Sequence, residues 1–243
     1  MALPIRNKVP RSKPRGINNA FQAAGFRQPS PQGAENSLGE IEVQSRLQQV
    51  FGLSSEVIQD VIMQGLLART TCTMHHPKTF PGLSQWAETV RALRDKTAPL
   101  NWSSSDVNNF PLCIHPSGNL VIAIYTGDHD TGVTGNNPSN RAAKGTNTEQ
   151  AVWANQKQLS LFDSFPDLPS AEDNDGRIMW VLLYHVAANQ IRFELSLPLK
   201  MIGGKIRSWQ ERLVFPAIPL DQVNIVIEDD DGPEFEVHVE RRN

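Results

Sequence analysis

Three consecutive polar residues, Asp128, His129 and Asp130, stand where an apolar run ends and a long polar segment begins. Two carboxylates and an imidazole could hold a divalent metal ion or supply a general base. The run does not fit a calcium-binding loop, because Val133 stands where that loop needs glycine and Ser139 where it needs a bidentate glutamate. A metal-dependent hydrolase or nuclease centred on these residues is one hypothesis, and an ordinary Asp- and Gly-rich turn is the other.

Two cations, Arg141 and Lys144, follow in the same polar segment among glycine, asparagine and threonine residues. Cations beside accessible backbone amides suit an anion. The order Lys144-Gly145-Thr146 lacks the spacing of a phosphate-binding loop of nucleotide hydrolases. The pattern therefore favours contact with phosphate without nucleotide hydrolysis.

The sulfur-containing candidates for a metal site are Cys72 with His75 or His76, and Cys113 with His115. A set of Cys and His ligands is what zinc prefers, and residues two apart on a strand leave the same face. Neither half has the separations of a zinc finger, and isolated cysteines are commonly small buried apolar residues. We expect no cofactor, with a divalent metal ion as the alternative.

Other catalytic arrangements are not found in the sequence. Nuclease sites often pair an acid with lysine two residues further along a strand, but Ser196 follows Glu194 at that spacing. No Gly-x-Ser-x-Gly sequence occurs, which argues against a serine nucleophile on a strand-to-helix turn. His185 ends an apolar run and is interpreted as a core or strand-end histidine.

The distribution of charge is uneven. Residues 1–34 contain six of the 23 basic residues and none of the 26 acidic ones, which leaves a net charge of −9 on the remainder. A basic arm on an acidic body is typical of a segment that meets a polyanion, although a solubilising tail has the same composition. The six cations of this arm are Arg6, Lys8, Arg11, Lys13, Arg15 and Arg27.

Apolar residues at helical spacing predict three helices, over residues 38–51, over about 54–69 and from Ser84 to about Pro99. The glycine between the first two would suit a helix-turn-helix motif. The second helix, however, offers no basic residue between Glu56 and Leu67, so it is poorly suited to reading DNA bases. An ordinary helical hairpin is the favoured interpretation.

After residue 99 the apolar pattern changes to a period of two, which predicts strands. In residues 191–197 the apolar side chains alternate with Arg192, Glu194 and Ser196, which indicates a strand with one solvated face. The remaining expected strands are 112–115 and 120–125 as a hairpin, 177–186 as a central strand, 205–209 after a Gly203-Gly204 turn, and a last hairpin within 223–239. Lys200, Lys205 and Arg207 around this turn either protect a sheet edge or grip nucleic acid together with Trp209.

Helices before strands predict an α+β fold with a mostly antiparallel sheet. We expect a disordered basic arm over residues 1–37, a helical segment over 38–99 and a β region over 100–243. Within the β region, 126–149 is expected to be a long polar loop and 164–176 an acidic linker.

Composition bounds the class of protein. Two cysteines in 243 residues are too few for a disulfide framework, which agrees with a reducing compartment. No apolar run approaches the roughly 18 to 20 residues of a membrane helix, and early prolines interrupt any secretory signal. We therefore expect a cytoplasmic protein without membrane contact.

These observations predict a non-catalytic binding or assembly protein. Its arm would engage nucleic acid or an acidic protein surface, while its body docks on another protein subunit. The metal-dependent hydrolase or nuclease remains the alternative. The two differ in whether the fold brings Glu194 or His185 within coordination distance of the Asp128 segment.

Overall fold

The computed structural model describes residues 31–163 and 177–220, with side chains over 39–157 and 177–220. The six cations of the arm, the linker at 164–176 and the expected last hairpin lie outside the described residues. The chain divides into two compact units, Met1–Leu38 and Gly39–Asn243, and the second unit contains the sheet.

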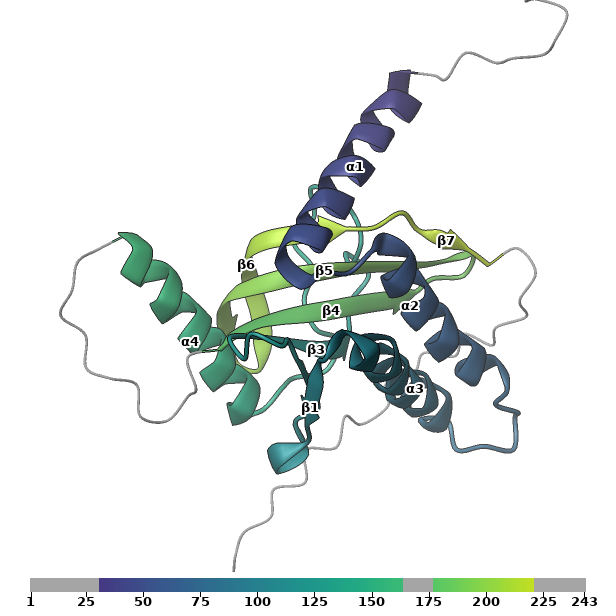
Figure 1. The fold of residues 1–243 in the computed structure, drawn as a ribbon. Helices are drawn as coiled ribbons and strands as arrows, with labels where there is room; N and C mark the ends of the chain where they lie inside the picture. Colours follow the sequence, from purple (N-terminus) through teal and green to yellow (C-terminus); the bar gives the residue numbers. More distant parts are fainter. Residues whose placement is uncertain (1–30, 164–176, 221–243) are drawn as a thin grey trace, which may run out of the picture. The chain divides into compact units, whose positions relative to one another are not determined.

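Four α-helices occur in the described residues (Figure 1): α1 Pro31–Phe51, α2 Ser55–Thr70, α3 Phe80–Thr97 and α4 Thr146–Asp163. The first three precede the strands, so the predicted α+β order is confirmed. Helix α3 begins four residues earlier than predicted, because Pro81 lies in its first turn, where a missing N–H costs nothing. Helix α4 was not predicted, and the expected loop 126–149 ends inside its first turn.

The sheet is mostly antiparallel, as predicted. Its order is β1-β2-β3-β4-β5-β6, with β7 also paired to β5. Strands β3 and β4 are parallel to each other and are separated in the chain by α4, whereas the other pairs are antiparallel. The strands are β1 Ser103–Ser105, β2 Leu112–Ile114, β3 Leu120–Thr126, β4 Ile178–Val186, β5 Gln190–Ile202, β6 Lys205–Val214 and β7 Ile218–Pro219.

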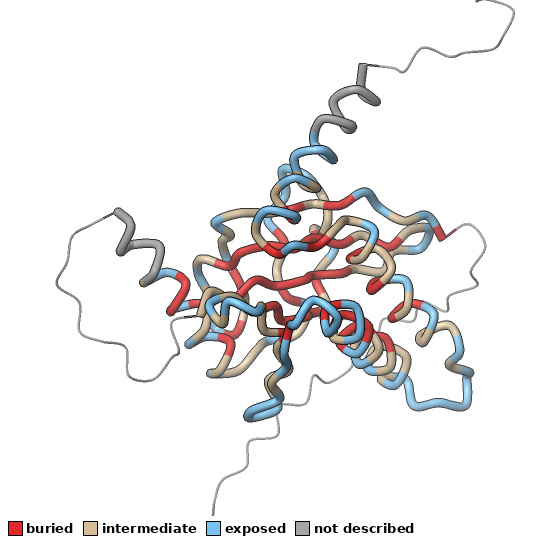
Figure 2. The backbone as a smooth tube through the Cα atoms, in the orientation of Figure 1, coloured by how far each residue is buried: buried red, intermediate tan, exposed pale blue. Residues whose placement is uncertain are grey.

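Both faces of the sheet are buried, and each belongs to a different core. The helix face packs side chains such as Ile122, Leu182 and Phe193 against α1, α2 and α3. The opposite face, which we call the loop face, packs Ala123 and Leu183 with residues of α4. Figure 2 shows the buried residues concentrated in the central strands. No described helix is long and apolar enough to cross a membrane.

The prediction that one face of β5 is solvated is wrong. The alternation itself is present, since Ile191, Phe193 and Leu195 lie in the core of the helix face. On the other side, however, Glu194 and Ser196 are 0% exposed. They are buried because residues 127–145, which we call the crossover loop, cover this side of the strand and bind it through hydrogen bonds described below.

Helices α2 and α3 approach each other closely at Gly65. A Cβ atom on Gly65 would stand 2.0 Å from Thr89 Oγ1 and 2.8 Å from the carbonyl oxygen of Gln85. Thr89 is itself fixed there, because its hydroxyl donates to Gln85 O at 2.7 Å. The helix crossing therefore requires glycine at this position.

We predict that Gly65→Ala lowers the free energy of unfolding by about 1 to 2 kcal/mol, because overpacking exceeds the gain in helix propensity. Urea denaturation of the full chain measures this. Gly39→Ala is the matched control, because Gly39 is also helical and nothing lies within 4 Å of its Cβ position. Equal stability of the two variants would contradict the proposed close contact.

Candidate functional site

The crossover loop follows β3, and the carboxyl end of β3 lies beside that of β4. Because these strands are parallel and adjacent, their ends meet at one edge of the sheet, the position where open α/β sheets bind ligands. The loop then returns along β3: Gly127 and Asn140 form an isolated antiparallel bridge, and Arg141 N donates to Thr126 O at 2.8 Å. The predicted site residues of the loop are thereby placed beside the ends of both strands.

Asp128 fastens the two sides of the crossover loop together. Its Oδ1 accepts a hydrogen bond from Asp130 N at 3.2 Å, and its Oδ2 accepts one from Ser139 N at 3.0 Å. Its own backbone N–H donates to Ser139 O at 2.9 Å. Both carboxylate oxygens are therefore engaged in shaping the loop.

His129 and Asp130 do not converge with Asp128 on a common point. The His129 side chain is 83% exposed, and its Nε2 lies 3.5 Å from Asp130 Oδ1. Asp130 Oδ1 also accepts a hydrogen bond from Asn136 Nδ2 at 2.6 Å. Among the described residues, no three His, Cys, Asp or Glu side chains are grouped to hold a metal ion.

A buried ion pair anchors the crossover loop to the sheet. Arg212 on β6 contacts Glu194 on β5 through two hydrogen bonds, Nε to Oε2 at 2.6 Å and Nη2 to Oε1 at 2.9 Å. The Glu194 carboxylate also accepts from Ser196 Oγ at 2.7 Å and from Gly132 N at 2.8 Å. Arg212 donates further to the loop carbonyls of Val133 and Asn136. Glu194 thus reaches the loop, but it binds backbone rather than the Asp128 side chain.

A second anchor joins the crossover loop to the turn between β5 and β6. The fully buried Asn140 donates from Nδ2 to Gly204 O at 2.8 Å and accepts from Ile206 N at 2.9 Å. Lys205 Nζ donates to Asn140 O at 2.8 Å, and Trp209 Nε1 donates to Pro138 O at 2.8 Å. Lys205 and Trp209, which follow the Gly203-Gly204 turn, therefore hold the crossover loop.

Two of the cations predicted to contact phosphate, Arg141 and Lys144, lie in the crossover loop. Arg141 is exposed. Lys144 is half-buried, with its Nζ 4.2 Å from the centre of the Tyr125 ring. Lys200 and Arg207 are exposed on the neighbouring strands β5 and β6. The other predicted phosphate contacts, Arg6, Lys8, Arg11, Lys13 and Arg15, lie outside the described residues.

His185 also reaches the crossover loop. Its Nδ1 lies 3.3 Å from Gly127 O. Burial lowers the pKa of His185, the hydrogen bond with Gly127 raises it, and Arg192 and Arg141 lower it further while Asp128 raises it. Residues from β4, β5 and the loop therefore act on one imidazole, although the sequence marks His185 only as the end of an apolar run.

The cysteine and histidine candidates lie on separate elements and are not gathered into a metal-binding group. Cys72 is half-buried after α2, and its Sγ lies 3.5 Å from Ala68 O. Cys113 is buried in the core of the helix face. Burial raises the pKa of the Cys113 thiol to about 11, although Arg94 acts in the opposite direction. Because zinc binds the thiolate, such a thiol is a poor ligand.

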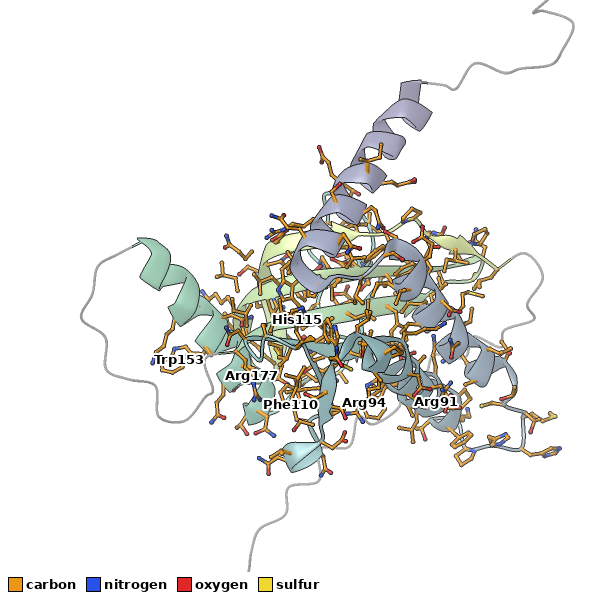
Figure 3. All side chains as sticks on the ribbon, viewed as in Figure 1. Arg91, Arg94, Phe110, His115, Trp153 and Arg177 are labelled. Carbon is orange, nitrogen blue, oxygen red and sulfur yellow. The ribbon has the colours of Figure 1, made fainter. Side chains whose placement is uncertain are left out.

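The histidines of these two candidate pairs make local contacts. His75 is exposed, and His76 stacks on Phe80 with ring centres 4.8 Å apart. His115 (Figure 3) packs edge-on against Trp102 at 4.9 Å, and burial lowers its pKa. His76 and His115 are thus placed by neighbouring aromatic rings.

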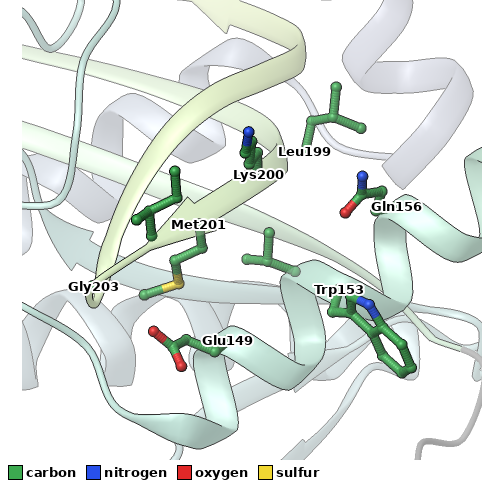
Figure 4. A pocket seen from close by; sticks show the side chains of 9 residues that line it. Glu149, Trp153, Gln156, Leu199, Lys200, Met201 and Gly203 are labelled. Carbon is green, nitrogen blue, oxygen red and sulfur yellow. The ribbon is translucent and has the colours of Figure 1, made fainter.

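A groove of about 350 Å³ lies between α4 and the end of β5 (Figure 4). Its lining includes Trp153, Gln156, Lys200 and Met201. Trp153 is 57% exposed, with Lys157 Nζ 3.5 Å from its ring centre. None of the catalytic or metal-binding candidates from the sequence lines this groove.

No protein-family model, curated protein or solved structure matches the chain.

We predict that Arg212→Ala lowers the free energy of unfolding by about 3 to 5 kcal/mol, because it leaves the Glu194 carboxylate buried without its cation. Arg46→Ala is the matched control. Arg46 binds Glu211 with the same pair of distances, 2.6 and 2.9 Å. Its ion pair is more exposed, at 42% and 29% for the two side chains against 18% and 0% for Arg212 and Glu194.

Arg46→Ala should therefore cost at most about 1 kcal/mol. Urea denaturation of both variants gives the comparison. Equal losses of stability would show that burial does not set the strength of the Arg212 contact.

We also predict that iodoacetamide at pH 8 alkylates Cys72 well before Cys113 in the folded chain. A pKa of about 11 leaves only about a thousandth of Cys113 as thiolate at that pH, and the side chain is also buried. Mass spectrometry of peptides from timed samples gives both rates, with urea-unfolded chain as the control. Equal rates in the folded chain would contradict the described position of Cys113.

Proposed function

We propose that this chain is a non-catalytic binding or assembly protein whose basic arm engages nucleic acid while its body docks on another protein. The observation that carries this proposal is the division of charge, with +6 on residues 1–34 and −9 on the remainder. Lysine and arginine bind phosphates by releasing condensed counterions, which needs neither a folded arm nor base recognition. The arm would therefore supply affinity without sequence specificity.

Glu194 and His185 both reach the crossover loop, as the hydrolase alternative expects, but they contact its backbone and not the side chains of Asp128, His129 and Asp130. The hydrogen bonds of the carboxylates support binding over hydrolysis. In a metal-dependent hydrolase or nuclease on Asp128, His129 and Asp130, the carboxylates would have to coordinate the ion. Both oxygens of Asp128 instead accept backbone N–H groups, and Asp130 accepts the Asn136 amide. Among the described residues, these carboxylates are also not grouped with a third His, Cys, Asp or Glu that could complete a metal site.

Exposed apolar side chains on the helical hairpin support a protein partner. Met63 and Leu67 lie one turn apart on α2, and Phe80 and Leu83 lie near the start of α3. Their exposed fractions run from 37% for Met63 to 64% for Leu67. Large apolar side chains that stay exposed on one helical hairpin are candidates for contact with a partner protein. We also propose a cytoplasmic location, because two cysteines in 243 residues are too few for a disulfide framework.

We predict that binding of the full chain to fluorescein-labelled duplex DNA weakens steeply with salt. With six arm cations neutralising phosphates, log affinity against log salt should have a slope approaching about −5. Fluorescence anisotropy from about 50 to about 200 mM NaCl measures the slope. A variant with all six arm cations replaced by glutamine should bind much more weakly and with a slope nearer zero.

The matched control exchanges lysine and arginine within the arm, which keeps its charge and should retain the slope. Undiminished binding by the glutamine variant would overturn the proposal. Titration with polyglutamate at the same salt concentration compares the two classes of partner: tighter binding to DNA supports nucleic acid, and tighter binding to polyglutamate supports an acidic protein surface.

A further inference from the structure

The groove between α4 and the end of β5 runs along the backbone edge of the strand (Figure 4). The β5 side of its lining consists of the consecutive residues 199–202, followed by Gly203 in the turn. Neighbouring side chains of a strand point to opposite faces, so a groove on one face would be lined by every second residue. Consecutive lining therefore indicates that the edge itself opens into the groove. We call residues 199–202 the open edge.

The open edge is paired with a strand on one side. In the described residues, β4 pairs with β5 no further than Ser196, whereas β6 continues beside the open edge. Beyond Ser196 the side chain of Asn155 on α4 joins the two strands, since its amide donates to Met179 O at 2.8 Å and to Pro198 O at 3.1 Å. Alternate residues of a strand direct their N–H and C=O groups to opposite sides, so part of the backbone of the open edge faces away from β6.

The walls of the groove are largely apolar. Val152 is buried at its base, whereas Trp153 on α4 is 57% exposed and Ile202 on β5 is 54% exposed. Met201 lies between them and packs on the core of the loop face. An extended peptide that adds a strand to such an edge gains hydrogen bonds from its backbone, and its alternate side chains enter the apolar groove.

The charges at the groove favour an acidic peptide. Lys200 is exposed in its lining, and Lys157 Nζ lies 3.5 Å from the centre of the Trp153 ring. The carboxylate in the lining, Glu149, accepts a hydrogen bond from Gly204 N at 3.1 Å, which offsets part of its charge. The groove therefore suits a segment whose apolar residues alternate with acidic ones.

The chain itself contains such a segment after β7. Phe235, Val237 and Val239 alternate with Glu236 and His238, the pattern of a strand with one apolar side. Residues 221–243 hold eight of the 26 acidic residues of the chain and two basic ones. These residues lie outside the described part of the chain, and their composition matches both the apolar walls and the cations of the groove.

The segment is long enough to reach the groove of its own chain. Leu220 N donates to Asn189 O at 2.8 Å, and β7 pairs with the first residues of β5, so the segment departs from the opposite end of that strand. The open edge lies about 25 to 35 Å further along β5, at a rise of about 3.3 Å per residue. Residues 221–234 span up to about 45 Å when extended, which exceeds that separation.

We propose that residues 235–239 bind in this groove of the same chain, as a strand added to the open edge of β5. Phe235, Val237 and Val239 face Trp153 and the other apolar side chains, while the acidic residues between and beside them lie near Lys200. The contact is a site in the body of the protein and goes beyond the function proposed for the arm. It requires neither residues 1–34 nor nucleic acid.

The test is amide hydrogen exchange of the full chain, followed by mass spectrometry of its peptic peptides. Val237→Asp places a carboxylate against the apolar walls, so it should release the segment and speed exchange at the open edge about tenfold or more. His238→Asp is the matched control, because it adds the same charge on the opposite side of the added strand and should leave exchange nearly unchanged. Unchanged exchange of residues 181–183 in the central strand β4 confirms that each variant is folded.

Trp153→Ala changes the groove instead of the segment. It should speed exchange both at the open edge and in residues 235–239, because it removes an apolar wall that the added strand contacts. Exchange of residues 181–183 serves again as the internal control.

Unchanged exchange at the open edge in Val237→Asp would overturn the proposal, as would equal effects of Val237→Asp and His238→Asp. A contact within one chain does not depend on concentration. Protection that disappears when the unaltered chain is diluted would assign the segment to the groove of a second copy and overturn the contact within one chain. The glutamine variant of the arm should keep the protection, so failure of the arm proposal and failure of the groove proposal give different results.

Discussion

The ion pair between Glu194 and Arg212 is the contact on which the loop side of the structure depends. A carboxylate with 0% exposure is tolerated only where its hydrogen-bond sites are filled, and Glu194 fills them from β5, from β6 and from Gly132 in the crossover loop. The sheet therefore requires the loop to cover the carboxylate, and the loop requires the carboxylate to hold its backbone. Each stabilises the conformation of the other.

This mutual requirement explains why a segment rich in glycine and asparagine has a defined path. Its backbone groups find partners on Glu194 and Arg212 at one end, and at the other end Lys144 N donates to Gly204 O in the turn. Gly204 has φ +74°, and a Cβ there would meet Ala143 at 2.8 Å, so the turn and the loop fit only without a side chain. Polar residues that suggest chemistry in the sequence thus serve first to hold the chain in place.

Local periodicity predicted the elements whose burial follows from neighbours along the chain. Ile58, Val61 and Leu66 form the buried side of α2, and the β2–β3 hairpin and central β4 lie where the apolar runs place them. The burial of Glu194 was not predictable, because alternation reports which side of a strand is polar and not whether a distant segment covers it. Helix α4 lacks a wide apolar face, since it buries the polar Asn155 beside Val152 and Ala154. His185 gains its environment from Gly127, 58 residues away.

The contact proposed for the arm is electrostatic and does not depend on a defined geometry. Binding by the arm depends on the number of cations and is screened by salt, so it would tolerate any polyanion. The body carries a net charge of −9 and repels polyanions except where cations are concentrated. The repulsive body would thus confine attachment to a polyanion to the arm, where affinity follows the number of cations and not their geometry.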